Sequence, residues 1–304
     1  EAAFNGKQYP KSGLLFKRNE SIKDAEEKLF YIPAQRVVCL QNGWPRFFTD
    51  YEDSVPYVLR HFSETLRQLL EYGSTEKDDA VFPQNQRLKA PLRDSFNDSI
   101  FHNGKIVIDK SGKKRFKLNF SNTSIPFMAW SAGQKEFMPL LLSFYWLCPP
   151  SKASRKDEVK YVIVEEPEMG LHPQAIKSVM LQIIDLLSRD YKVIVSTHSP
   201  VLLEFAWAFQ FLKQAKAGDN ALYELFDLKK SAPLNRLFKD IIKNKKINTY
   251  SFDRNNDMVI VKDISSLDAG SEDASVSEWG GLSSFSSKAA DIISKIMSNE
   301  DENK

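Results

Sequence analysis

Two short apolar runs separated by one amphipathic segment constrain the fold of this chain more than any other feature. The first run, residues 161–164, ends in two carboxylates, Glu165 and Glu166. The second run, residues 193–195, ends in the polar sequence Ser-Thr-His-Ser-Pro. Between them, apolar residues recur at three- and four-residue steps, which is the period of a helix with one buried face. These residues are Ile176, Val179, Met180, Ile183, Ile184 and Leu187.

Strand, helix and strand joined by short connections predict a βαβ unit, in which the two strands run parallel. We expect both strands to be buried on both faces, as is usual for parallel sheets. The polar clusters then lie at the carboxyl ends of neighbouring strands. Open α/β sheets bind their ligands at this edge, so the sequence predicts a ligand site there.

The residue types at this edge suit phosphoryl transfer. A carboxylate directly after a buried strand can hold Mg²⁺, directly or through a water, and a second carboxylate can orient an attacking water. His198, after the second strand, can donate a hydrogen bond to a γ-phosphate. A purely structural explanation would also have to account for Pro167, Gly170 and the Thr-His-Ser-Pro run together, so we prefer the functional interpretation.

These motifs resemble the C-terminal half of an ABC-type ATPase head, as found in OLD-like and SMC-like proteins. The resemblance makes Glu165 the Walker B metal carboxylate, Glu166 the catalytic residue that polarises the attacking water, and His198 the switch histidine. It covers residues 127–205 well and the flanks loosely. It also identifies a D-loop, formed by Met169, Gly170, Leu171, His172 and Pro173.

Four residues further upstream are similar to the ABC signature, which contacts the γ-phosphate held by the opposite subunit. They open a predicted helix over residues 135–147, and a helix N-terminus is a natural anion site. Four residues alone are weak evidence, but their order and spacing with the other motifs make them specific. The resemblance implies ATP and Mg²⁺ as ligands and a homo-oligomer that holds ATP between subunits. The four residues are Ser131, Ala132, Gly133 and Gln134.

The sequence departs from this pattern at the phosphate loop. An ATPase of this type needs G-x-x-x-x-G-K-[S/T], whose backbone amides and lysine hold the phosphates. Gly6 and Gly112 are each followed by lysine but lack the rest of the motif. We expect the half with the phosphate loop to lie outside these 304 residues or on another chain. A degenerate ATPase is the alternative, but it leaves the catalytic Glu and the switch His unexplained.

The predicted fold is α/β, an ABC-type P-loop NTPase head without its N-terminal Walker A half. It has a parallel central sheet with helices on both faces, antiparallel hairpins at 103–120 and 248–265, and a helical lid that includes 56–72. The predicted segments are 1–30, a connection from the missing half; 31–126, the lid region; 127–205, the ATPase core; 206–264, C-terminal helices and a hairpin; and 265–304, a Ser- and Asp-rich tail with a short helix.

The composition bears on the compartment of the protein and on its contact with membranes. The net charge is +2, and no apolar run approaches the roughly 20 residues that span a bilayer. The two cysteines, Cys39 and Cys148, follow apolar residues and lack partners for a metal site. Two buried thiols are typical of a reducing compartment, so we expect a cytoplasmic protein without membrane contact.

Basic residues suggest three further contacts. Arg36 ends a Tyr-Ile-Pro-Ala-Gln-Arg segment similar to one in OLD-like ATPases, so it either faces the nucleotide or a neighbouring subunit, or forms a surface salt bridge. A basic helix with Lys239, Lys243 and Lys245 could bind DNA, although it also reads as an ordinary amphipathic helix. The Lys and Arg of the 103–120 hairpin could touch a phosphate backbone, but we prefer a solvated strand face.

The resemblance implies an ATPase subunit of a bacterial antiphage defence complex, an OLD-like member of the AAA proteins whose nucleotide state controls a separate effector. The effector would be a nuclease or a toxin. OLD proteins carry a Toprim nuclease on the same chain, and this sequence has no such acidic pattern after His198. Two alternatives stay open: a DNA-repair or DNA-end ATPase of the RecF and SMC type, and a non-hydrolysing ABC-like scaffold.

Overall fold

The computed structural model describes residues 3–4, 7–8, 28–72, 80–150 and 158–302. The chain forms two compact units, which we describe separately. The large unit contains residues 28–197 and 219–243, and the small unit contains 198–218 and 244–302 together with the short strands β1 (Ala3–Phe4) and β2 (Lys7–Gln8).

A three-stranded parallel sheet forms the centre of the large unit. Its strands are β3 (Lys28–Ile32), β10 (Val159–Glu165) and β11 (Lys192–Ser196), in the order β11-β10-β3. The helix α4 (Pro173–Ser188) connects β10 to β11. This confirms the predicted βαβ unit, and the register sets Glu165 opposite Ser196.

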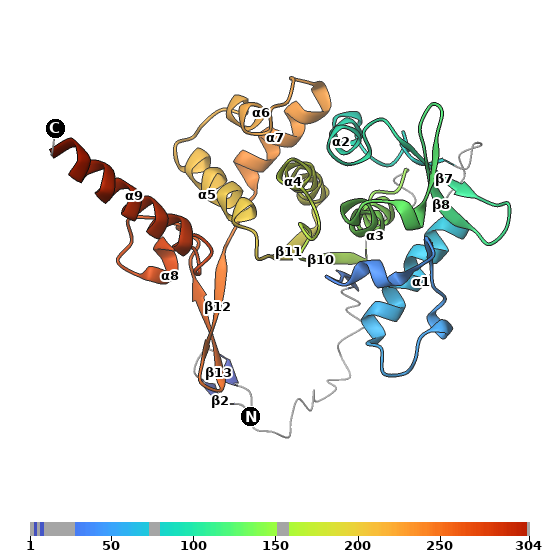
Figure 1. Cartoon of the computed structure of the whole chain (residues 1–304), viewed down its shortest axis with the longest axis horizontal. Coiled ribbons are helices and arrows are strands. Elements are labelled where there is room, and N and C mark those ends of the chain that lie inside the picture. Colours follow the sequence, from blue (N-terminus) through green and yellow to red (C-terminus); the bar gives the residue numbers. More distant parts are fainter. Residues whose placement is uncertain (1–2, 5–6, 9–27, 73–79, 151–157, 303–304) are drawn as a thin grey trace. The chain divides into compact units, whose positions relative to one another are not determined.

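In the described part of the chain, only one face of this sheet is buried. Val162, Val164 and Ile32 point into the main core, where α4 and the long apolar helix α3 (Ala132–Leu147) cover them (Figure 1). On the opposite face, Leu29 and Ile194 are each 52% exposed. The prediction that the strands are buried on both faces is therefore wrong for the described residues, because α3 and α4 lie on the same side of the sheet (Figure 1).

The main core is built around α3. Its residues from Phe137 to Tyr145 are all buried, and their aromatic rings pack against the helix α2 (Ala90–Phe96), with 4.8 Å between the ring centroids of Phe96 and Phe137. The amphipathic helix α1 (Tyr57–Tyr72) adds Phe62, Leu66 and Leu70 and confirms the helix predicted over 56–72. Short elements line the same core: η1 (Arg36–Cys39), β4 (Leu40–Gln41), β5 (Trp44–Pro45), η2 (Phe48–Asp50), η3 (Asn97–Phe101) and η4 (Phe127–Ala129).

A four-stranded antiparallel sheet flanks this core. It consists of β6 (Ala80–Phe82), β7 (Lys105–Asp109), β8 (Arg115–Asn119) and β9 (Ser124–Pro126), in chain order. The pairing of β7 with β8 confirms the predicted hairpin. The large unit also contains α6 (Asn220–Leu225) and nearly all of α7 (Ala232–Asn244), whose buried side is formed by Leu234, Leu237, Phe238 and Ile241.

The small unit has a modest core. It contains α5 (Pro200–Gln214), the antiparallel pair β12 (Tyr250–Asn255) and β13 (Met258–Asp263), α8 (Ala274–Ser277) and α9 (Ser284–Glu302). The pair β12–β13 confirms the second predicted hairpin. Ala206, Ile264 and Leu267 form the buried centre, against which Trp279 packs. No helix in the described part of the chain is both long and apolar enough to cross a membrane.

One buried ion pair fastens α4 to the segment before α2. Asp185 on α4 is fully buried and accepts hydrogen bonds from Lys89 and, at 2.8 Å, from Nε of Arg189. The free thiol of Cys148 lies beside the same carboxylate, with 3.9 Å between Sγ and Oδ2. The two cations satisfy a charge that would otherwise be very costly to bury.

Asp185→Asn should lower the free energy of unfolding by about 3 kcal/mol, because it leaves two cations without their buried counter-charge. Asp227→Asn is the matched control, since Asp227 is 76% exposed in its 2.7 Å ion pair with Lys177. The control should lose less than about 1 kcal/mol. Urea unfolding of both variants measures the difference, and equal losses would contradict a buried role for Asp185.

Candidate functional site

The carboxyl ends of β10 and β11 bring the two predicted polar clusters together. Glu165 is the last residue of β10 and lies opposite Ser196, the last residue of β11. The backbone N–H of Glu166 donates to the carbonyl of Ser196 at 2.9 Å. Thr197 follows, and its hydroxyl donates to Oε1 of Glu168 at 2.5 Å. Three carboxylates of the Glu-Glu-Pro-Glu run therefore lie at one edge of the sheet.

The segment after β3 positions the Glu165 carboxylate. Its Oε2 accepts a hydrogen bond from the backbone N–H of Ala34 at 3.2 Å. Tyr31, on β3, is hydrogen-bonded to the same carboxylate through its side chain. Burial, then this hydrogen bond and the negative charge of Glu165, raise the pKa of the Tyr31 phenol to about 12. Sequence reasoning missed Tyr31, although it opens the Tyr-Ile-Pro-Ala-Gln-Arg segment.

Glu166 has a strained backbone. Its φ angle is +40°, in the left-handed region that side chains other than glycine rarely adopt. Such a conformation costs on the order of 1–3 kcal/mol and persists only where surrounding contacts enforce it. Here the N–H of Glu166 bonds to Ser196, and its carbonyl accepts from both Nη1 and Nη2 of Arg36 at 3.2 Å.

Arg36 is fully buried in the large unit. Besides the Glu166 carbonyl, its guanidinium donates to the carbonyl of Glu165 at 3.1 Å and to the carbonyl of Glu136, on α3, at 3.1 Å. Burial lowers the pKa of Arg36, and the nearby carboxylates of Glu136, Glu168 and Glu166 oppose that shift. The prediction of a surface salt bridge is therefore wrong, because the branched donors of Arg36 satisfy interior carbonyls. The contact of Arg36 with a nucleotide or a neighbouring subunit stays a prediction.

The predicted signature and the predicted D-loop pack against each other within the chain. A Cβ atom added to Gly133 would lie 2.6 Å from the carbonyl oxygen of Gly170, closer than any real contact. Gly170 itself has φ +71°, which glycine adopts without strain. Leu171 is half-buried next to this contact. Both positions therefore require glycine, one for close approach and one for its backbone conformation.

Ser131 and Gln134, the two polar residues of the predicted signature, cap the N-terminus of α3. Gln134 donates its N–H to Oγ of Ser131 and accepts from the N–H of Ser131, both at 3.2 Å, which is a capping box. The side-chain amide of Gln134 also donates to the Ile100 carbonyl at 3.1 Å. Ser131 and Ala132 are exposed. The contact of these residues with a nucleotide on another subunit stays a prediction.

His172 begins α4. It is exposed, and its Nδ1 accepts the N–H of Gln174 at 3.3 Å, so the ring caps the helix. His198 is also exposed, two residues after β11, and belongs to the small unit, whereas Glu165 and Glu166 belong to the large one. The switch role of His198 stays a prediction.

The basic residues predicted for nucleic-acid contact lie around the end of α7. Lys239 and Lys243 are exposed on the helix, and Lys245 follows it, half-buried. The backbone carbonyl of Lys245 accepts from the ammonium of Lys213 on α5, within the small unit. The contacts of these side chains with DNA stay a prediction.

A half-buried glutamate that sequence reasoning missed lies behind the site. Oε2 of Glu136 is buried and has no hydrogen-bond partner among the described residues. Burial raises the pKa of Glu136, and the charge of Arg36 opposes the rise. Glu136 follows Gly133 on α3 and would lie 3.3 Å, at its Cγ, from a Cβ on Gly170. No short motif marks it, because its position depends on contacts between distant segments.

The carboxylates fit a magnesium ion that arrives with a nucleotide. In the described part of the chain, no three His, Cys, Asp or Glu side chains are grouped so that they could hold a metal ion by themselves. Mg²⁺ bound with phosphates usually takes only one or two carboxylates and keeps several waters. Glu165 could supply such a carboxylate, since Tyr31 and Ala34 orient it and its two oxygens can accept further bonds.

Gly133→Ala should destabilise the protein by about 2 kcal/mol, since the new methyl group meets the Gly170 carbonyl and one backbone must move. Gly218→Ala is the matched control, because nothing lies within 4 Å of a Cβ there. Urea unfolding compares the two variants. A Gly133→Ala protein as stable as the control would mean that the two loops are not in contact.

Tyr31→Phe should reveal a pH-dependent contribution. The pKa of Tyr31 in the folded protein, about 12, lies above the ordinary value near 10. The protonated phenol therefore stabilises the fold fully below about pH 10, and this contribution is lost as the pH rises towards about 12. Unfolding at pH 8, 10 and 11 should show the gap between wild type and variant narrowing. The exposed Tyr72→Phe control should show no such change.

The chain is similar to known proteins over part of its length. The family profile described as "AAA domain, putative AbiEii toxin, Type IV TA system" matches residues 7–204. The chain is 27% identical over 89 residues to the "Old nuclease" of Escherichia phage P2, which covers 29% of this chain and 15% of that protein. It thus spans a small part of this relative, and no solved structure matches significantly. Since the profile covers well over half of the sequence, the chain belongs to this family of AAA domains.

Proposed function

We propose that this protein binds and hydrolyses ATP as the ATPase of a defence or toxin-type system. Membership of the AAA-domain family supports nucleotide binding and ATPase activity in general. The similarity to the phage Old nuclease, and the toxin named in the family description, support the setting. The observation that carries the proposal is the pair Glu165 and Glu166 at the carboxyl end of β10, fixed by Tyr31, Ala34 and Arg36.

Each residue of the edge has a task in this proposal. Bound Mg²⁺ and ATP supply the phosphoryl group and neutralise its charge. Glu165 is the carboxylate for the metal, and Glu166 orients the attacking water and accepts its proton. The strained, doubly anchored backbone of Glu166 favours one direction for its side chain, as expected of a preorganised group. His198 senses the γ-phosphate.

The nucleotide is held between two subunits in this proposal. Ser131, Ala132, Gly133 and Gln134 form the clamp on ATP bound by the opposite subunit, and Gly170, Leu171 and His172 form the D-loop. The exposure of Ser131 and Ala132 at the N-terminus of α3 supports this, because the N–H groups there attract anions. The homo-oligomer that results holds or releases a separate nuclease or toxin according to its nucleotide state.

The proposal needs a phosphate-binding segment that these 304 residues do not supply, since no phosphate-loop motif occurs in them. Among the described residues, one face of the parallel sheet is exposed and could receive such a segment. Leu29 and Ile194 stand on that face, and parallel strands are normally covered on both sides.

Glu166→Gln in the full-length protein should lower ATP turnover by roughly two to four decades, the range expected for the loss of a general base. ATP should stay bound, in a stable oligomer, because the amide keeps the size of the carboxylate. Turnover, nucleotide retention and oligomer size are measured together. Glu204→Gln, at an exposed position on α5, is the control and should keep full turnover.

Two results would count against this function. If the full-length protein neither binds nor hydrolyses ATP, it is a scaffold, and the roles of Glu165, Glu166 and His198 are wrong. If Glu166→Gln hydrolyses ATP as fast as the Glu204→Gln control, another residue orients the water.

A further inference from the structure

The β7–β8 hairpin concentrates positive charge. Its residues 105–117 contain six basic side chains and one acidic one, a net charge of +5, whereas the whole 304-residue chain carries only +2. The rest of the chain is therefore slightly acidic, and the hairpin forms a local field of its own. The basic residues are Lys105, Lys110, Lys113, Lys114, Arg115 and Lys117.

Strand alternation separates this charge from the core. Ile106, Phe116 and Leu118 point inward and are buried, which anchors the hairpin to the large unit. The opposite face is formed by the register pairs Lys105 with Asn119, Val107 with Lys117 and Asp109 with Arg115. Basic and amide side chains thus stand on the outer face of the two central strands of the four-stranded sheet.

The one acidic residue of the hairpin is already neutralised. Asp109 accepts hydrogen bonds from the hydroxyl and the N–H of Ser111 at 2.7 and 3.0 Å, and Lys117 approaches it at 2.9 Å. These contacts hold the pKa of Asp109 well below its usual value, so the group is ionised and occupied. In the described structure, Lys105, Lys113 and Lys114 have no carboxylate partner, although Lys114 also lies 5.5 Å from the ring of Trp44.

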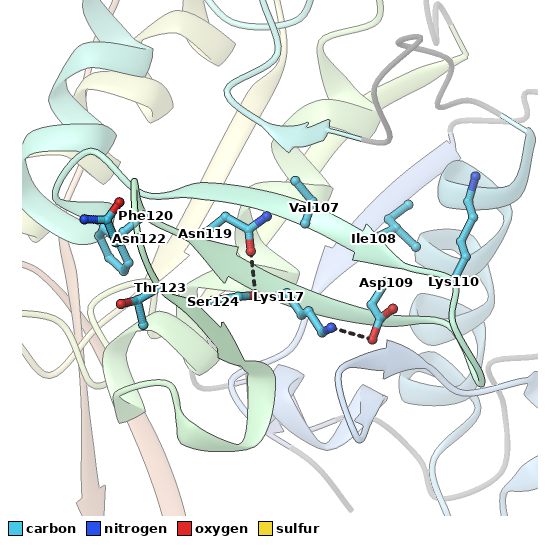
Figure 2. Close-up of a pocket in the computed structure, with 10 residues that line it drawn as sticks. All are labelled: Val107, Ile108, Asp109, Lys110, Lys117, Asn119, Phe120, Asn122, Thr123 and Ser124. Carbon is cyan, nitrogen blue, oxygen red and sulfur yellow. Dashed lines mark hydrogen bonds and ion pairs between the residues drawn. The ribbon is translucent and has the colours of Figure 1, made fainter.

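The outer face continues into a shallow hollow of about 560 Å³ (Figure 2). Lys117, Asn119 and Ser124 line it, and the Ser124 hydroxyl donates to Oδ1 of Asn119 at 2.7 Å. Lys110 extends from the turn at one end, and Asn122 and Thr123 lie at the other (Figure 2). Lysine, amide and hydroxyl groups of this kind are the usual contacts of phosphate and sugar oxygens.

We propose that the outer face of the β7–β8 hairpin and its hollow bind the phosphate backbone of duplex DNA without reading its sequence. Beyond the pairings with β6 and β9, residues 108–116 form a two-stranded end of the hairpin, which fits the major groove of a duplex, and the lysines near it can replace the counterions of the phosphates. A single strand is the poorer ligand, because it needs several aromatic rings for stacking, whereas Phe116 is buried on the inner face and the hollow offers one half-buried ring, that of Phe120. This binding is independent of the proposed ATPase activity.

The basic helix α7 is the competing surface, and its surroundings are less suitable. The hollow beside α6 is lined by Glu224 and Asp227 as well as by Lys230. Asp240 lies on α7 itself, next to Lys239. Residues 224–246 contain three acidic and seven basic side chains, a net charge of +4, whereas the shorter segment 105–117 of the hairpin carries +5.

The test compares two triple variants of the whole chain by fluorescence anisotropy with a labelled 20-base-pair duplex, without nucleotide. One variant is Lys105→Gln, Lys113→Gln, Lys114→Gln, and the other is Lys239→Gln, Lys243→Gln, Lys245→Gln. Both lose three positive charges, so a change in overall charge affects them equally. The three hairpin lysines are exposed, so the melting temperature should stay at the wild-type value.

We expect the hairpin variant to bind the duplex at least about tenfold more weakly than wild type. The slope of log affinity against log salt should become shallower by about 2.7, that is, about 0.9 for each lost phosphate contact. The α7 variant should stay within about twofold of wild type. Equal losses in both variants, a larger loss in the α7 variant, tighter binding of a single strand, or no duplex binding by wild type would each overturn the proposal.

Discussion

The buried guanidinium of Arg36 is the interaction on which the geometry of the sheet edge depends. It satisfies three carbonyl oxygens that belong to two different elements, the end of β10 and the first turns of α3. Buried carbonyls without donors are costly, so these elements can meet at this point only if a branched donor lies between them. Lysine has the charge but not the fork, and it could not hold both elements at once.

The carboxylates of the site are consequently held in position by contacts from the interior of the large unit. Strand β3 supplies the phenol of Tyr31, and the segment after it supplies the N–H of Ala34 and Arg36; all three act on Glu165 or Glu166. In the proposed function, the outward side of the carboxylates faces the nucleotide and its metal. The strain at Glu166 is consistent with this division, since its backbone is held from the interior while its side chain is half-buried at the edge.

Local patterns predicted the elements that are amphipathic or alternating. The β10–α4–β11 unit, α1 and both hairpins follow from hydrophobic periods of 3.6 and 2. Contacts between distant segments were beyond such patterns. Arg36 lies 100 residues from its partner Glu136, and nothing around it distinguishes a buried arginine from an exposed one. The one-sided burial of the sheet was missed for a related reason, because Leu29 and Ile194 look like core residues.

The contact between the backbones of Gly133 and Gly170 has a mechanical consequence. Side chains in contact absorb small displacements by changing rotamer, but two backbones at van der Waals distance have no such slack. The first turn of α3 and the loop before α4 are therefore mechanically coupled, so that a displacement of one must displace the other. Arg36 donates both to the carbonyl of Glu136 on α3 and to the carbonyl of Glu165, so we expect such a displacement to reach the end of β10. The large unit thus contains a stiff linkage between its surface and its carboxylates.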